Sequence, residues 1–167
     1  MNVELRSMLR TEGETLSFGR HVGSLLEAGD WIALTGELGS GKTTFVSGVL
    51  ASLHPGTRVR SPTYVLVEVY GAKPTVVHAD LFRIASSKEY AGLGLEDLAE
   101  GDAVVLVEWA DRAAAELPPD RLDLELRYLD GGGRELRIRP RGDRWESLAR
   151  EGAFDRDRWH DALYPGN

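Results

Sequence analysis

The feature that most constrains the fold of this chain is a glycine-rich segment at residues 36–43, with the sequence GELGSGKT. The segment matches the pattern G-x-x-x-x-G-K-[ST], in which backbone amides surround phosphate groups. This pattern requires a strand before it and a helix after it. The apolar run at residues 31–34 predicts the strand, and apolar side chains along one face of residues 44–53 predict the helix. The sequence therefore predicts a site for the phosphates of a nucleotide.

The residue types in this segment suit that chemistry. Its three glycines permit backbone conformations that are closed to other residues, and they leave room for phosphate oxygens. The first turn of the following helix adds unpaired N–H groups and the positive end of the helix dipole. We expect Lys42 to reach the β- and γ-phosphates and the hydroxyl of Thr43 to bind Mg²⁺.

Length and composition narrow the class of protein. The 167 residues suit one hydrophobic core and are short for two. A net charge of −7 argues against a free-standing nucleic-acid binder, which usually carries a basic face. The absence of cysteine excludes a thiol nucleophile and a zinc–thiolate site. Because we find neither a signal-peptide core nor an apolar run of roughly 18 residues, we expect a cytoplasmic protein without a membrane span.

The rest of the chain alternates between strand-like and helix-like patterns. Thr11, followed three residues later by Glu14, predicts a capping box at the start of a first helix. Two strand-like stretches joined by a short turn predict an antiparallel hairpin that ends at Asp80. The strands of this hairpin are expected at residues 63–70 and 75–80. The other expected elements are an edge strand at 3–9, short helices at 86–91 and 95–99, a strand at 103–109 and a second hairpin from 121 to 139.

These elements predict an α/β fold built around a strand, a glycine loop and a helix. We expect one nucleotide-binding domain over residues 1–150 and a C-terminal tail over residues 151–167. Pro118 and Pro119 are expected to separate the nucleotide-binding core from the second hairpin. Three apolar side chains of the tail, Trp159, Leu163 and Tyr164, either pack back on the body or dock a partner, and we favour packing.

An acid follows the most apolar strand of the chain. Glu108 ends that strand, which is the Walker B pattern, where a carboxylate holds a magnesium-bound water. A rival lies at Asp130, where the spacing D-x-x-G resembles a GTPase motif. Alternating apolar and polar residues on both sides favour a hairpin turn at Asp130 instead. Since the chain also lacks an N-K-x-D guanine-binding motif, ATP is favoured over GTP.

Four segments, taken in order, closely resemble the TsaE (formerly YjeE) family. They are residues 36–45 (GELGSGKTTF), 61–64 (SPTY), 78–83 (HADLFR) and 108–109 (EW). The resemblance extends from about residue 11 to residue 138. It implies a P-loop NTPase-like fold, in which helices flank a mixed parallel and antiparallel sheet, and ATP hydrolysis with Mg²⁺. It further implies a partnership with the TsaD and TsaB proteins, which attach threonylcarbamoyl to adenosine 37 of tRNA. It also implies that tRNA is reached only through that complex.

The resemblance implies roles for individual residues. Lys42, Asp80 and Glu108 become the catalytic candidates, and Thr43 and Glu108 the metal ligands. Asp80 either orients the attacking water or completes the metal shell; the alternative is a strand-end acid that caps the next turn. The expected nucleotide-binding residues are Glu12, Glu37, Leu38, Gly39, Ser40, Gly41, Lys42, Thr43 and Thr44, and the expected switch or partner residues are Ser61, Pro62, Thr63, Tyr64 and Trp109.

Several alternatives stay open at this point. A small-molecule kinase would need an acceptor pocket and an arginine-rich lid, for which the segment from Asp80 to Glu108 is short. A nucleotide-dependent binding module with incidental hydrolysis is the third hypothesis. For the ATPase we expect low activity alone and stimulation by partners, since no arginine finger stands at a diagnostic position. Trp109 is expected either at the nucleotide or partner surface or in the core. His78 is expected to be a hydrogen-bonded core residue.

Overall fold

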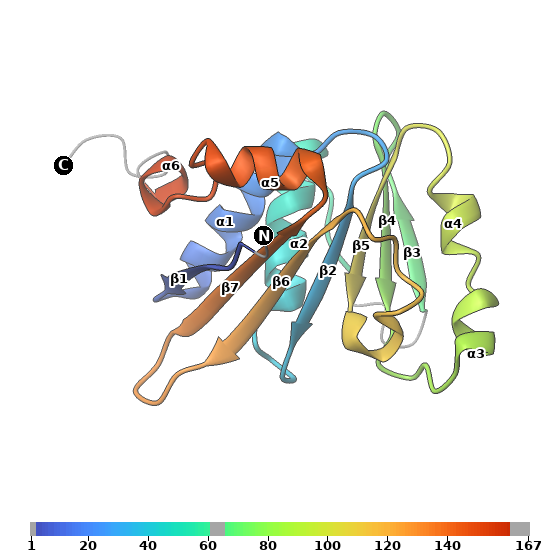
Figure 1. Cartoon of the computed structure of the whole chain (residues 1–167), viewed down its shortest axis with the longest axis horizontal. Coiled ribbons are helices and arrows are strands. Elements are labelled where there is room, and N and C mark those ends of the chain that lie inside the picture. The colour runs from blue at the N-terminus through green and yellow to red at the C-terminus, as the bar shows by residue number, and fades with distance from the viewer. Residues whose placement is uncertain (1–2, 61–65, 161–167) are drawn as a thin grey trace.

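In the computed structural model, which describes residues 3–60 and 66–160, one sheet runs through the molecule in the order β1-β7-β6-β2-β5-β4-β3 (Figure 1). Helices lie on both of its faces. The strands described are β1 (Leu5–Leu9), β2 (Trp31–Gly36), β3 (Val67–Tyr70), β4 (Thr75–Asp80), β5 (Ala103–Glu108), β6 (Arg121–Tyr128) and β7 (Arg134–Arg141). The helices are α1 (Glu12–Leu25), α2 (Lys42–Leu53), α3 (Ser87–Ala91), α4 (Leu95–Leu98), α5 (Asp143–Arg150) and α6 (Arg156–His160), with a 3₁₀ turn η1 (Ala110–Ala113).

The sheet is mixed, as the sequence predicted. Strands β6, β2, β5 and β4 run parallel to their neighbours within this group, and the strands outside them pair antiparallel. The hairpin of β3 and β4 and that of β6 and β7 are both present. The first hairpin strand was expected from residue 63, but residues 63–65 lie outside the described part of the chain. The parallel centre brings the carboxyl ends of four strands to one edge, where α/β proteins bind ligands.

The expected separation of the second hairpin from the nucleotide-binding core is wrong. Strand β6 pairs directly with β2, and Ile32 lies opposite Leu122 in the parallel register. The side chains of Leu122, Leu124 and Leu126 are buried in the same core as the helix after the glycine loop. The two prolines at 118 and 119 therefore shape a connection within one sheet, because the apolar face of β6 has to be buried against α1 and α2.

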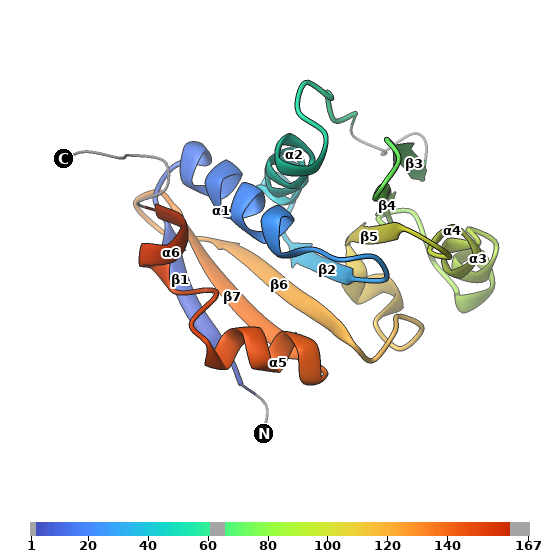
Figure 2. The same ribbon diagram turned by 90° about the horizontal axis from the view of Figure 1, so that it is seen from above.

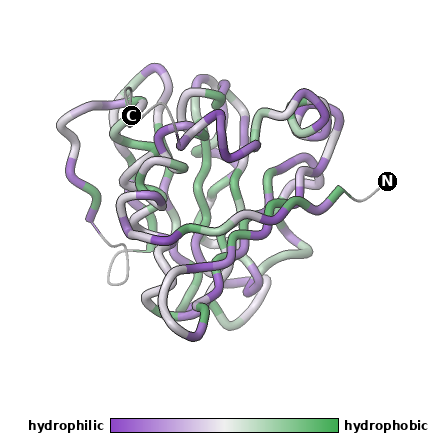
Figure 3. Tube along the Cα trace, turned by 90° about the vertical axis from the view of Figure 1, so that its left-hand side faces the viewer, coloured by the Kyte–Doolittle hydropathy of each residue, from purple (hydrophilic) through white to green (hydrophobic). Residues whose placement is uncertain are grey.

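Apolar side chains form one core on each face of the sheet. The larger core lies between the sheet and helices α1 and α2, which Figure 2 shows side by side over one face. The second lies under α3, α4 and η1 on the other face and contains the buried ring of Tyr90. Strand β5 is buried along its whole length because it contributes to both cores. The hydropathy trace in Figure 3 shows the same arrangement, with hydrophobic strands in the interior and hydrophilic loops around them.

Helix α1 begins at the expected cap, with one difference. The Thr11 hydroxyl accepts a hydrogen bond from the N–H of Glu14 at 3.1 Å, as a capping box requires. The carboxylate of Glu14, however, accepts from the N–H of Arg10 at 2.7 Å, one residue before the cap. It also binds the guanidinium of Arg156, which explains why it reaches past the cap.

Part of the C-terminal segment belongs to the larger core. Trp159 of α6 is 1% exposed and its ring lies 5.5 Å from that of Phe18 in α1, at an interplanar angle of 70°. Phe154 is buried beside Trp145 of α5. The preference for packing over docking is thus confirmed for Trp159; Leu163 and Tyr164 lie outside the described residues. Among the described helices, none has the length and apolar character that a membrane crossing requires.

Candidate functional site

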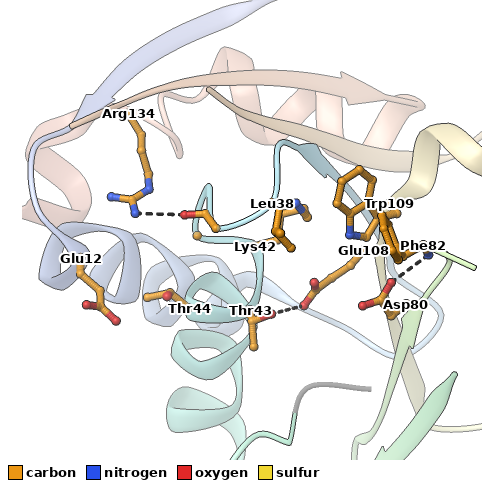
Figure 4. Close-up of a pocket in the computed structure, with 12 residues that line it drawn as sticks. Glu12, Leu38, Lys42, Thr43, Thr44, Asp80, Phe82, Glu108, Trp109 and Arg134 are labelled. Atoms are coloured by element: carbon orange, nitrogen blue, oxygen red, sulfur yellow. Dashed lines mark hydrogen bonds between the residues drawn. The ribbon is translucent and has the colours of Figure 1, made fainter. Parts of the chain in front are cut away.

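A cavity of about 560 Å³ lies at the carboxyl edge of β2, β5 and β4. This volume is within the range of pockets that hold small ligands. Figure 4 shows that side chains from the glycine loop, the two acid-bearing strands and the start of β7 converge on it. It is lined by Glu12, Leu38, Gly39, Gly41, Lys42, Thr43, Thr44, Asp80, Phe82, Glu108, Trp109 and Arg134.

The glycine loop has the backbone that the sequence predicted. Gly39 and Gly41 have φ angles of 75° and 107°, in the left-handed region that favours glycine. A Cβ at Gly36 would lie 2.6 Å from the hydroxyl of Ser40, so only glycine fits there. Ser40 itself is fully buried beneath the loop and does not line the cavity. Glu37 lines a neighbouring hollow and is not among the residues that line this cavity.

Lys42 is held against the loop by neutral acceptors. Its ammonium donates to the carbonyls of Gly36 at 2.6 Å and Glu37 at 2.8 Å. It also lies 4.3 Å from the ring centroid of Trp109. Burial lowers the pKa of Lys42, and the carboxylates of Glu108 and Asp80 oppose that shift. A phosphate oxygen would offer this buried cation a charged acceptor in place of the carbonyls.

Thr43 and Glu108 meet across two elements. The Thr43 hydroxyl at the start of α2 donates to Glu108 Oε1 at the end of β5, at 2.9 Å. The parallel register places Glu108 opposite Leu34, just before the loop. Hydroxyl and carboxylate oxygens are the ligands that Mg²⁺ prefers, so this pair fits a magnesium ion whose remaining ligands are phosphate and water. Within the described residues, no group of three or more histidine or acidic side chains is placed to hold a metal by itself.

His78 bonds directly to the acid of this site. Its Nε2 lies 2.9 Å from Glu108 Oε1, and the imidazole is completely buried in β4. Because a carboxylate only accepts hydrogen bonds, Nε2 carries the proton in this contact. The sequence predicted a buried, hydrogen-bonded histidine, but it did not predict the partner. The pairing of β4 with β5 decides the partner, and the register of two strands about 30 residues apart has no local signal.

Asp80 caps the turn after β4 and also lines the cavity. Its Oδ1 accepts the N–H of Phe82 at 2.9 Å, which is the strand-end cap. Its side chain also lines the cavity next to Glu108, its partner in the strand register. Burial raises the pKa of Asp80, and the charge of Glu108 adds to the shift against the opposing bond from Phe82. A carboxylate with a raised pKa is a better proton acceptor for a bound water.

Aromatic side chains line the cavity after the ends of β4 and β5. Trp109 has a φ of 56°, unusual for a residue other than glycine, and this turns its indole toward the cavity at the end of β5. The ring of Phe82 lies 4.9 Å from it. The guanidinium of Arg112 lies 5.6 Å from the Phe82 ring. Trp109 therefore lines the cavity and also packs, partly buried, against the core under α3, α4 and η1. Whether it contacts a nucleotide or a partner stays a prediction.

Two residues of the cavity wall were missed in the sequence. Phe82 was included in the segment at 78–83 without a role of its own, and Arg134 was not singled out. Arg134 follows the second hairpin turn, nearly 100 residues from the glycine loop, so only tertiary structure brings it there. Glu12 lines the cavity from the start of α1. Its contact with the nucleotide stays a prediction. The predicted switch residues Ser61 to Tyr64 lie outside the described part of the chain.

A glycine loop between a parallel strand and a helix, with a lysine, a hydroxyl and a strand-end acid beside it, defines the P-loop fold. The profile of one protein family, described as "Threonylcarbamoyl adenosine biosynthesis protein TsaE", matches residues 9–136. This match covers well over half of the chain, and the chain therefore belongs to the TsaE family.

Individual relatives agree with this assignment. The "tRNA threonylcarbamoyladenosine biosynthesis protein TsaE" of Treponema pallidum is 36% identical over 134 residues, covering 80% of this chain and 99% of the relative. The protein of the same name from Bacillus subtilis is 34% identical over 140 residues, which cover 83% of this chain and 87% of the relative. The crystal structure of Bacillus subtilis YdiB superimposes with a TM-score of 0.79 at 28% identity, covering 94% of this chain and 98% of that one.

Proposed function

We propose that this protein is a Mg²⁺-dependent ATPase that acts in tRNA N6-threonylcarbamoyladenosine modification as an accessory to a TsaD–TsaB complex. It would hydrolyse ATP to ADP and phosphate and reach tRNA only through that complex. The observation that carries the proposal is the meeting of Thr43 and Glu108 beside Lys42 at the glycine loop. The names of the relatives support the pathway, and a site in the cytoplasm follows from that pathway.

The residues of the site divide the chemistry among them. Lys42 would leave the carbonyls of Gly36 and Glu37 and neutralise charge on the β- and γ-phosphates. Thr43 and Glu108 would hold Mg²⁺, which supplies charge neutralisation at the same oxygens. Asp80 would orient the attacking water from the neighbouring strand end. Catalysis of this kind consists mainly of positioning and electrostatic stabilisation.

The carboxylate pair explains why a cation belongs in the site. Glu108 and Asp80 are 3% and 4% exposed and lie opposite each other at the ends of β5 and β4. Two buried carboxylates repel each other unless a cation or a proton lies between them. Lys42 supplies one positive charge. A bound Mg²⁺ would supply two more.

ATP turnover with Mg²⁺ tests the proposal. We would measure phosphate release by the chain alone and with TsaD, TsaB and tRNA, and compare it with Glu108→Gln and Lys42→Ala. We expect slow turnover alone and stimulation by the complex. Each substitution should lower the stimulated rate about a hundredfold or more, the usual loss when an electrostatic group of the transition state is removed.

The same experiment separates the alternatives. Stimulated turnover that survives both substitutions would contradict the site. Nucleotide binding without stimulated turnover would favour a binding module. Transfer of labelled phosphate to a small molecule in a metabolite mixture would indicate a kinase and overturn the proposal. Arg127→Met, an exposed change on β6 away from the cavity, serves as the matched control and should behave as the unmodified chain.

A further inference from the structure

We propose that the end of the β6–β7 hairpin is a clamp that holds the phosphate loop in its binding conformation, with Arg134 and Tyr128 as its positioning residues. The two residues lie opposite each other in the antiparallel register, at the last pair before the turn. The Arg134 guanidinium lies 5.1 Å from the Tyr128 ring centroid. The inference rests on the proposed function only in assuming that the loop binds phosphates.

Both side chains donate hydrogen bonds to carbonyls of the phosphate loop. Arg134 Nε donates to the carbonyl of Ser40, and its Nη2 lies 3.4 Å from that of Gly39. The Tyr128 hydroxyl donates to the carbonyl of Gly39. Arg134 packs so closely that a Cβ on Gly41 would lie 3.2 Å from its Nε. Figure 4 shows the arginine approaching the loop from the side of the cavity opposite Glu108.

The geometry of the peptide bond links the direction of a loop carbonyl to the direction of the amide that follows it. In a trans peptide the C=O and the following N–H point in opposite directions. A Ser40 carbonyl that is held toward Arg134 therefore points the N–H of Gly41 away from Arg134. Arg134 thus orients a phosphate-binding amide without occupying the phosphate position itself.

The loop needs such a restraint because of its composition. It contains Gly36, Gly39 and Gly41 within six residues, and glycine loses more conformational freedom on ordering than any other residue. Its tip residue Leu38 is 82% exposed and contributes little packing. A loop that is already ordered before the ligand arrives binds more tightly, because that entropy is not lost again on binding. The positive charge of Arg134 on the cavity wall also favours an anionic ligand.

Hydrogen exchange of the unliganded protein tests the clamp without any nucleotide. We would measure amide exchange over residues 36–44 in Arg134→Met, Tyr128→Phe and the control Arg127→Met, which removes an arginine from the same hairpin. We expect faster exchange in the loop for the first two and no change for the control. Arg134→Lys, which keeps a charged donor, should restore part of the protection.

Ligand affinity provides the second measurement. Arg134→Met should raise the dissociation constants of ATP and of inorganic tripolyphosphate by the same factor, about tenfold, which corresponds to the loss of a charge-assisted hydrogen bond. Tripolyphosphate has no base or ribose, so an equal loss locates the effect at the phosphate loop. A loss for ATP alone would show that Arg134 binds the nucleoside and would overturn the clamp.

The outcomes distinguish the clamp from the proposed function. Unchanged exchange of the loop in Arg134→Met would overturn the clamp, and so would a rise spread over the whole chain, since that would mean general destabilisation. A chain that shows the local exchange effect but no partner-stimulated ATP turnover would keep the clamp and contradict the proposed function. Partner-stimulated ATP turnover without the local exchange effect would contradict the clamp and leave the proposed function standing.

Discussion

At the scale of single residues, the carboxylate of Glu108 depends on two donors that approach the same oxygen. Thr43 arrives from α2 and His78 from the neighbouring strand β4, each at 2.9 Å. Both donors are needed because Glu108 is almost completely buried, and a buried charge that loses a partner keeps its desolvation cost. His78 therefore positions the acid that we assign to the metal, although it does not line the cavity itself.

This contact leads to a prediction for His78. His78→Leu should lower the free energy of unfolding by about 1–3 kcal/mol, because it leaves a buried carboxylate short of one donor. His78→Gln, which retains an N–H donor, should lose clearly less. Urea denaturation at pH 7 of both variants measures the difference. Equal losses would show that the volume of the imidazole matters and that its hydrogen bond does not.

At the scale of elements, the crossing of α1 and α2 determines where the start of α1 lies. The two helices approach so closely at Gly19 and Gly48 that a Cβ on Gly48 would lie 2.9 Å from the Cα of Gly19. Only a glycine pair allows this distance. Because α2 begins at the phosphate loop, the close crossing places Glu12 of α1 at the cavity.

We expect Gly48→Ala to destabilise the protein even though alanine favours helices. The added methyl meets backbone atoms that cannot move independently, and overpacking of this kind costs about 1–3 kcal/mol. Gly13→Ala is the matched control, because Gly13 lies in the same helix pair and its Cβ would have only one neighbour, at 3.6 Å. That control should be neutral or stabilising by up to about 1 kcal/mol. Thermal or urea denaturation compares them, and equal stability of the two variants would contradict the close crossing.

At the scale of the whole molecule, the C-terminal helix is tied to the start of the chain. Glu14 in α1 binds the guanidinium of Arg156 at 2.7 Å, and His160 lies 3.4 Å from the same carboxylate. Trp159 between them is buried against Phe18. Burial disfavours the charged form of Glu14, but the bonds from the Arg10 N–H and Arg156 outweigh it and lower the pKa of Glu14 below 4.5.

The lowered pKa predicts how stability depends on pH. Since the folded state holds the Glu14 carboxylate more strongly ionised than the unfolded state, its contribution is complete above pH 4.5 and is lost as pH falls through the folded pKa. Glu14→Gln should thus be less stable than the unmodified chain by about 1 kcal/mol at pH 7, with the gap closing at acid pH. Denaturation curves at pH 7 and below pH 4 measure the gap, with exposed Glu100→Gln as the control. A gap independent of pH would contradict the ion pair.

Much of the site was predictable because its signals are local. The glycine loop, Lys42 and Thr43 lie within eight consecutive residues, whose spacing is set by the phosphate group that they surround. Glu108 was predictable because a carboxylate at the end of a very apolar strand is rare without a function. The hairpins and short helices were predictable from the alternation of apolar and polar residues and from the positions of glycines, which are also local signals. Each of these inferences uses only neighbours along the chain.

The sequence by itself determined the phosphate loop, the order of elements and the class of fold, since periodicity and turn chemistry are properties of short segments. Tertiary structure alone decided that β6 pairs with β2, that His78 meets Glu108, and that Arg134 reaches the loop from the far end of a hairpin. These contacts join residues 30 to 95 positions apart. They depend on strand register and on which faces are buried together, and both are settled only when the whole core packs.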